Sequence, residues 1–265
     1  MKKWIAALCI FALLCSLAAC GGKTPGNEPG TESDPAPEAA MRLRLVNGAG
    51  TDRLVLAGEG RGDLYVAGPG DLTLYIDGEA ADLTRLENGM LLDIDPGFTS
   101  LETWPAQLKN ATVRMRSAAG ENGHGDLCGL YLKVLEDLWA DDAGLNGDIT
   151  YVSVYLDEAP GGLTDGEKAA VTWIFSGRHN AEGLGLDISG LRAGGYMSET
   201  ELYWADGVLF RIRQTAGGKS DENKITFDAE KWRSGDGAVF YFKCESKRGE
   251  GLSWGDYTPG SYGIA

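Results

Sequence analysis

The chain has few of the residues on which catalysis and metal binding commonly depend. Its only histidines are His124 and His179, which are too far apart in the sequence to form a His pair at helical spacing, and the chain has no Cys-x-x-Cys motif. No serine lies in a Ser-x-x-Lys pattern, and there is no phosphate-binding glycine loop. We therefore predict no metal, no cofactor and no catalytic residue, which favours a protein that is not an enzyme. Both histidines are expected on surface loops.

Basic residues are also scarce. The chain contains 24 Lys plus Arg against 39 Asp plus Glu, a formal net charge of −15. Such a chain repels phosphate backbones and anionic lipid headgroups. Nucleic acid is therefore excluded as a partner, and any membrane attachment has to come from another group. We interpret the charge itself as a means of keeping the protein soluble.

Cysteine is too rare to build a disulfide framework. Of five cysteines, Cys9, Cys15 and Cys20 lie near the N-terminus, which leaves Cys128 and Cys244. These two have apolar neighbours, as is typical of thiols that pack in a core. Whether they pair stays open at this point.

The N-terminus has the order of a secretory signal. Lys2 and Lys3 precede an apolar run over residues 4–14 that is too short for a membrane span. Leu17-Ala18-Ala19-Cys20 resembles the lipobox of bacterial lipoproteins, in which the cysteine is acylated, for example with palmitate, and the preceding peptide is removed. The resemblance implies a signal peptide over residues 1–19 and a lipid on Cys20. It also implies a location outside the cytoplasm, anchored to the cell membrane.

The segment that follows this signal has the composition of a linker. Residues 20–40 are rich in Gly, Pro, Thr, Ser and Glu, and no large apolar residue is present to form a core, so we predict a disordered tether. Without Lys2 and Lys3 the remaining chain has 22 basic and 39 acidic residues, a formal charge of −17.

Residues 41–118 alternate apolar and polar positions with a period of two, which predicts short β-strands separated by glycine turns. Six or seven strands in so short a stretch predict a small, closed β-barrel. A helical turn is expected over residues 81–88. The alternating positions are Met41-Leu43-Leu45, Leu54-Leu56, Leu64-Val66, Leu72-Leu74-Ile76, Leu92-Ile94 and Val113-Met115.

A short motif near the end of this stretch resembles a sequence signature of other proteins. Residues 101–107 (LETWPAQ) resemble an E-x-aromatic-P-A-Q signature that closes small OB-like barrels in uncharacterised lipoproteins of Gram-positive bacteria. The resemblance implies an OB-like barrel. Trp104 is then a large apolar lid, and Pro105, which cannot donate to a strand ladder, marks a strand edge.

From residue 124 the apolar period changes to 3.6, which predicts a second, α+β domain over residues 124–265. Asp126 is the expected N-cap of a helix that ends at Gly144, and Thr164 with Glu167 forms a capping box for a second helix that stops at Gly177. A strand is expected over residues 151–156 between them. The chain as a whole is predicted to be α+β.

The remaining segments predict a mainly antiparallel sheet. Residues 202–204 and 208–213 are expected to form a hairpin around Asp206-Gly207. Strands over residues 224–227 and 238–244 are expected to be joined by a connection at residues 231–235. Residues 254–265 are predicted to be irregular coil.

Two clusters are candidates for binding. Trp204, Arg211, Trp232 and Arg233 combine flat aromatic rings with fork-shaped cations, which favours a ligand-binding surface on the second domain. The alternative is that the tryptophans pack in the core and that Arg233 bonds local carbonyls. Residues 142–148 partly follow a calcium loop but lack two of its ligands, so we interpret them as a plain helix-to-strand connection.

These patterns favour a non-enzymatic surface protein that binds an envelope protein, a peptide or a glycan and reaches the membrane through the lipid on Cys20. One alternative is a cell-wall or glycan hydrolase that uses two carboxylates. A third hypothesis, a purely structural envelope protein, predicts a flat apolar patch in place of a cleft.

Overall fold

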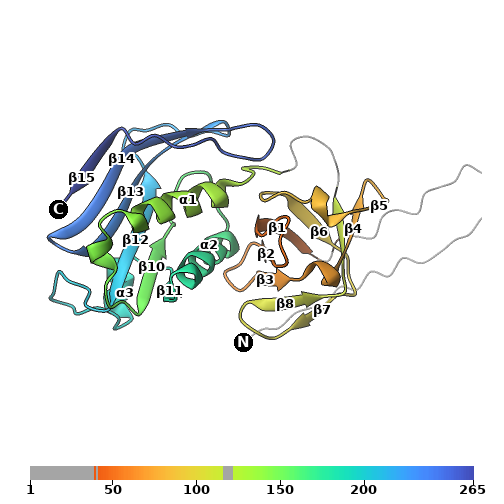
Figure 1. Cartoon of the computed structure of the whole chain (residues 1–265), viewed down its shortest axis with the longest axis horizontal. Helices are drawn as coiled ribbons and strands as arrows, with labels where there is room; N and C mark the ends of the chain where they lie inside the picture. The colour runs from red at the N-terminus through yellow and green to blue at the C-terminus, as the bar shows by residue number, and fades with distance from the viewer. Residues whose placement is uncertain (1–38, 40, 116–121) are drawn as a thin grey trace, which may run out of the picture. The chain divides into compact units, whose positions relative to one another are not determined.

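The structure is a computed structural model that describes residues 39, 41–115 and 122–265 (Figure 1). The predicted signal peptide, Cys20 and, apart from Ala39, the predicted tether lie outside these residues. Residues Pro37–Ala265 form one compact unit. Its described part contains two β-sheets and three α-helices, so the chain is a mixed α+β protein, as predicted. None of the described helices is long and apolar enough to cross a membrane.

The first sheet has nine strands in the order β5-β4-β9-β6-β1-β2-β3-β8-β7. Within the described residues its edge strands β5 and β7 do not pair with each other. The sheet is therefore an open half-barrel, and the closed OB-like barrel is not confirmed. The strands are β1 (Met41–Asn47), β2 (Leu54–Ala57), β3 (Leu64–Ala67), β4 (Leu72–Ile76), β5 (Glu79–Ala81), β6 (Leu91–Ile94), β7 (Thr99–Leu101), β8 (Ala106–Lys109) and β9 (Ala111–Met115).

The alternating apolar positions correctly located β1, β2, β3, β4, β6 and β9. In all of these except β3 the alternate side chains fill the interior of the curled sheet, whereas Leu64 and Val66 of β3 pack in the cluster shared with the helices. Strands β5 and β7 were missed because they are three residues long and mostly exposed. The expected helical turn is present as a short 3-10 turn at Leu83–Arg85, in which Asp82 accepts a hydrogen bond from the Thr84 amide.

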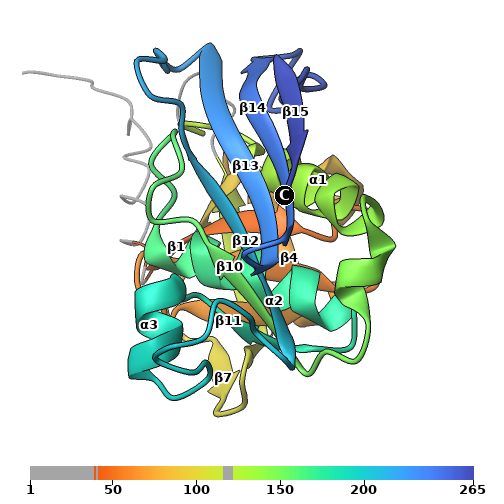
Figure 2. The same ribbon diagram turned by 90° about the vertical axis from the view of Figure 1, so that its left-hand side faces the viewer.

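The second sheet has the order β11-β10-β12-β13-β14-β15. Strand β10 is parallel to β11 and β12, and the other three pairings are antiparallel, so the sheet is mixed. Helices α1 (Leu127–Ala140) and α2 (Asp165–Arg178) cover one face, and α3 (Ile188–Ala193) lies against the other (Figure 2). The strands are β10 (Tyr151–Tyr155), β11 (Glu182–Leu184), β12 (Gly207–Gln214), β13 (Lys224–Ser234), β14 (Gly237–Lys247) and β15 (Ser261–Ile264).

The predicted helix starts are confirmed. Asp126 accepts a hydrogen bond from the Gly129 amide at the start of α1, and Thr164 with Glu167 forms the expected capping box of α2. The predicted ends were wrong. Helix α1 ends at Ala140, because Asp141 is already extended, and α2 continues past Gly177 to Arg178.

The predicted hairpin over residues 202–213 was wrong. Strand β12 pairs with β10 and β13 instead, and residues 202–204 form only a short bridge, in which the Trp204 amide donates to the Arg233 carbonyl at 2.8 Å. The expected connection at residues 231–235 was also wrong, since β13 continues through Ser234. Residues 254–265 are not all coil, because β15 pairs with β14 there.

The two sheets share buried contacts. One hydrophobic cluster joins Val55 and Leu64 of the first sheet to Val171 and Phe175 of α2. A buried ion pair connects Arg44 of β1 to Glu167 of α2. The β2–β3 turn and the start of α2 are therefore held against each other, and the site described next depends on this junction.

Candidate functional site

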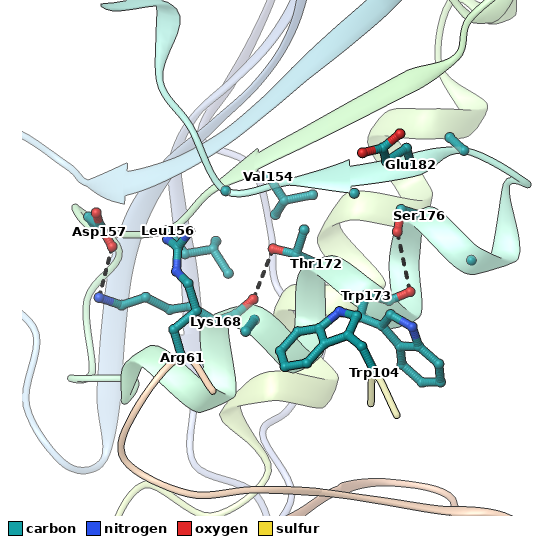
Figure 3. A pocket seen from close by; sticks show the side chains of 15 residues that line it. Arg61, Trp104, Val154, Leu156, Asp157, Lys168, Thr172, Trp173, Ser176 and Glu182 are labelled. Carbon is teal, nitrogen blue, oxygen red and sulfur yellow. Dashed lines mark hydrogen bonds and ion pairs between the residues drawn. The ribbon is translucent and has the colours of Figure 1, made fainter. Parts of the chain in front are cut away.

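A cleft of about 400 Å³ lies between α2 and the edge strand β11, and we call it the α2–β11 cleft (Figure 3). Two side chains from turns of the first sheet complete it: Arg61 from the β2–β3 turn and Trp104 from the β7–β8 connection. The other lining residues are Val154, Leu156, Asp157, Lys168, Ala169, Thr172, Trp173, Ser176, Gly177, Ala181, Glu182, Gly183 and Gly185.

Helix α2 has one face in the core and one in the cleft. Ala170, Val171, Ile174 and Phe175 belong to the core cluster that spans both sheets. The cleft face repeats every four residues, because 3.6 residues complete one helical turn. It presents Lys168, Thr172, Trp173 and Ser176.

Strand β11 contributes bare backbone. A Cβ atom on Gly183 would lie 2.6 Å from Ser176 Oγ, and one on Gly185 would lie 3.2 Å from Arg61 Nη2. Glycine at residue 183 lets β11 pack closely on α2, and glycine at residue 185 leaves room for the Arg61 guanidinium.

Two tryptophans, Trp104 and Trp173, line the cleft (Figure 3). Trp104 is 60% exposed, and Trp173 is partly buried. The Arg53 guanidinium carbon lies 5.0 Å from the centroid of the Trp173 ring, at cation–π distance. The two rings therefore give the cleft a large aromatic surface that solvent can reach.

Charged side chains also line the cleft. Lys168 Nζ donates to Asp157 Oδ1 at 2.9 Å and to Asp165 Oδ1 at 3.1 Å. Desolvation disfavours the ammonium, but these carboxylates outweigh it and raise the pKa of Lys168. The Arg61 side chain rises at the same end of the cleft, whereas Glu182 lies near Ser176 (Figure 3).

This arrangement suits a compact ligand. Its volume is in the range of small-molecule sites, and it combines aromatic surface with a few converging polar groups. Among the described residues no group of three or more His, Cys, Asp or Glu is placed to hold a metal ion.

Two of the residues proposed from the sequence have structural contacts. Trp204 is buried beside Leu191 and Leu209. The buried Arg233 guanidinium donates to the carbonyls of Leu145, Gly147 and Ala205 at 2.9, 2.6 and 2.6 Å. These contacts are those of the alternative interpretation, a core tryptophan and an arginine that bonds local carbonyls.

The other two proposed residues lie on neighbouring strands. Arg211 of β12 donates to both carboxylate oxygens of Glu230 at 2.8 Å, and Trp232 of β13 packs partly buried near Trp204. The described structure places none of the four proposed residues among those that line the α2–β11 cleft.

Both histidines lie in turns, as expected, but their rings are mostly buried, with 14% of each side chain exposed. His124 Nε2 lies 3.1 Å from Glu167 Oε2, beside the buried Arg44. The His179 ring stacks on Trp139 with 3.7 Å between centroids. Cys128 and Cys244 are buried and unpaired.

Sequence analysis missed most of the cleft. The second face of α2, with Lys168, Trp173 and Ser176 at helical spacing, was the available signal. Arg61 has no such signal, because its place depends on packing between distant segments. Comparison of the chain with protein-family models, with curated proteins and with solved structures finds no match. A functional argument therefore has to come from the site itself.

Proposed function

We propose that this protein is a lipid-anchored binding module outside the bacterial cytoplasm, and that its α2–β11 cleft binds a saccharide of the cell envelope. The anchor rests on the resemblance of residues 17–20 to a lipobox. The observation that supports the ligand class best is the presence of two tryptophans, Trp104 and Trp173, in the lining of a cleft of about 400 Å³. Indole faces cover the apolar faces of sugar rings, and the indole N–H and nearby polar groups suit the hydroxyls.

The dimensions of the site favour a saccharide over a peptide or a protein. Strand β11 is three residues long, which is short for binding a peptide by strand addition. A stable protein partner buries roughly 800 Å² on each side, and a small cleft alone does not supply such an area. The OB-like character of the first sheet stays a prediction. The motif that suggests it contains Trp104, which lines the cleft.

The hydrolase alternative has one observation in its favour, since Asp157 and Glu182 both line the cleft. A catalytic general acid is normally kept in an apolar, desolvated setting. The Asp157 side chain is 50% exposed and bonded to Lys168, and Glu182 is also exposed. Binding without cleavage therefore fits the site better.

Calorimetric titration of residues Pro37–Ala265 with soluble peptidoglycan fragments tests the proposal. We expect saturable binding that weakens about 30-fold in Trp173→Ala, the loss typical of a central aromatic contact. Tyr262→Ala is the matched control, because Tyr262 is an exposed aromatic on β15 and does not line the cleft. Absence of binding would refute the proposal, and release of new reducing ends would favour the hydrolase. Mass spectrometry of the native N-terminus tests the lipid on Cys20.

A further inference from the structure

The β2–β3 turn holds Arg61 in a defined backbone conformation. The Gly58 amide donates to the Asp63 carbonyl at 2.8 Å, and the Asp63 amide donates to the Gly60 carbonyl at 2.9 Å. The Asp63 carboxylate also accepts from the Gly60 amide at 2.8 Å. Arg61 therefore projects from a turn that is closed by three hydrogen bonds.

This turn is fixed to the start of α2. Thr164 Oγ1 donates to the Gly58 carbonyl at 2.7 Å, and the Gly166 amide donates to the Glu59 carbonyl at 3.3 Å. A Cβ atom on Gly166 would lie 2.4 Å from the Gly58 carbonyl oxygen, so the two segments are in close backbone contact. The base of the Arg61 side chain is consequently held at a set position relative to the cleft face of α2.

The two cations that line the cleft differ in their partners. Lys168 is bonded to two carboxylates, those of Asp157 and Asp165. Arg61 is exposed, and the described part of the chain shows no hydrogen bond or ion pair to it. Its guanidinium lies against the bare backbone at Gly185. Arg61 is thus the lining cation that remains available to a ligand.

The cleft carries side chains of opposite charge at two different places. The Arg61 side chain lies at the end near Asp157, and Glu182 lies at the end near Ser176, where an anion would be repelled (Figure 3). Trp104 and Trp173 also line the cleft. A ligand with one acidic group is expected to bind with its ring on the tryptophans and its acid towards Arg61.

We propose that the α2–β11 cleft is selective for an acidic sugar, with the sugar ring on Trp104 and Trp173 and the sugar carboxylate on the Arg61 guanidinium. This inference rests on the proposed function. The planar fork of guanidinium donors matches a carboxylate in a bidentate geometry, and such charge-assisted bonds are stronger than those between neutral groups.

The test compares N-acetylmuramic acid with N-acetylglucosamine. The two sugars share a ring, and only the first carries a lactyl ether with a carboxylate. Calorimetry with residues Pro37–Ala265 should give at least about tenfold tighter binding of the acidic sugar. Arg61→Gln should remove this preference, so that the two sugars bind with similar affinity. Arg53→Gln is the matched control, because Arg53 contacts the Trp173 ring but does not line the cleft. It should keep the preference.

The outcomes separate the inference from the proposed function. Equal binding of the two sugars would overturn the inference and leave the binding function standing. A preference that persists in Arg61→Gln would overturn the role of Arg61. Failure of both sugars and of larger peptidoglycan fragments to bind would contradict the proposed function itself. Since Arg61 is exposed, its variant should unfold at the native midpoint, which makes a loss of preference a direct effect.

Discussion

Two buried cations of β13 show how single residues stabilise the connection after α1. Lys231 Nζ donates to the carbonyls of Trp139, Asp141 and Asp142 at 3.3, 2.7 and 3.1 Å. The last turn of α1 contains no basic residue of its own, so this ammonium supplies the positive charge that a helix C-terminus favours. Burial lowers the pKa of Lys231 to about 8.

Arg233 acts similarly on the loop that follows, where its guanidinium donates to the Leu145 and Gly147 carbonyls. Arg233→Met should lower the free energy of unfolding by about 3 kcal/mol, because buried carbonyls lose their donors. Urea unfolding measures the loss, and saccharide binding should be unchanged. Lys224→Met, at an exposed ion pair with Glu245, is the control and should cost less than about 1 kcal/mol. A stable Arg233 variant that no longer binds ligand would restore the binding role suggested by the sequence.

The sequence permits both interpretations of Arg233 and does not distinguish them. The choice depends on carbonyls from residues 145 and 147, which β13 reaches only after the sheet has formed. Arg61 was not singled out at all. An isolated arginine in a glycine turn has no pattern, and its importance comes from Gly185 and α2, more than a hundred residues away.

At the scale of elements, the start of α1 combines a helix cap with a buried charge. Asp126 caps the Gly129 amide at 3.0 Å, and burial raises the pKa of its carboxyl from 3.8 to about 6, although this hydrogen bond and the nearby Arg44 oppose the shift. Between pH 6 and 3.8 the folded state holds a proton that the unfolded state has released. Stability from this group therefore increases as the pH falls through that window.

Asp126→Asn keeps a good N-cap but cannot titrate. We expect the variant to be more stable than the native protein by about 1–3 kcal/mol at pH 7, with the difference shrinking towards zero at pH 4. Urea unfolding at several pH values measures this difference.

Asp187→Asn at the start of α3 is the matched control. Hydrogen bonds from the Gly190 amide and the Ser189 hydroxyl lower the pKa of Asp187, so that variant should be the less stable one at pH 7, and its deficit should shrink in acid. A pH-independent difference for Asp126→Asn would refute the assignment.

Elements were predictable where their signals are local. The caps at Asp126 and Thr164 lie within three residues of the amides that they satisfy, and both were located correctly. The hairpin at Asp206-Gly207 failed because its turn signal is also local while strand pairing is not. Strand β12 pairs with β10 and β13 over more residues than the segment 202–204 contains.

At the scale of the whole molecule, the described structure joins both sheets through one buried cluster and the Arg44–Glu167 ion pair. The same carboxylate accepts a hydrogen bond from His124 Nε2. Desolvation opposes ionisation of Glu167, but this hydrogen bond and the interactions with His124 and Arg44 hold the pKa of Glu167 below its usual value. A substitution at this junction should therefore lower the stability of both sheets together.

Residues Pro37–Ala265 should unfold in one transition, with far-UV circular dichroism and tryptophan fluorescence coinciding. Glu167→Gln leaves the buried Arg44 without its counter-charge and should lower the whole transition by about 3 kcal/mol without splitting it. Lys224→Gln, at an exposed pair, should shift it by less than about 1 kcal/mol. Two separate transitions in the native protein would show that the sheets fold independently.

The most direct measurement of ligand binding follows the indole N–H signals of the protein by NMR during titration with soluble peptidoglycan fragments. Single Trp→Phe variants assign each signal. We predict that the signals of Trp104 and Trp173 shift with saturation, while those of Trp204 and Trp232 stay in place. Shifts confined to Trp204 and Trp232, or no shift at all, would contradict a ligand site between α2 and β11.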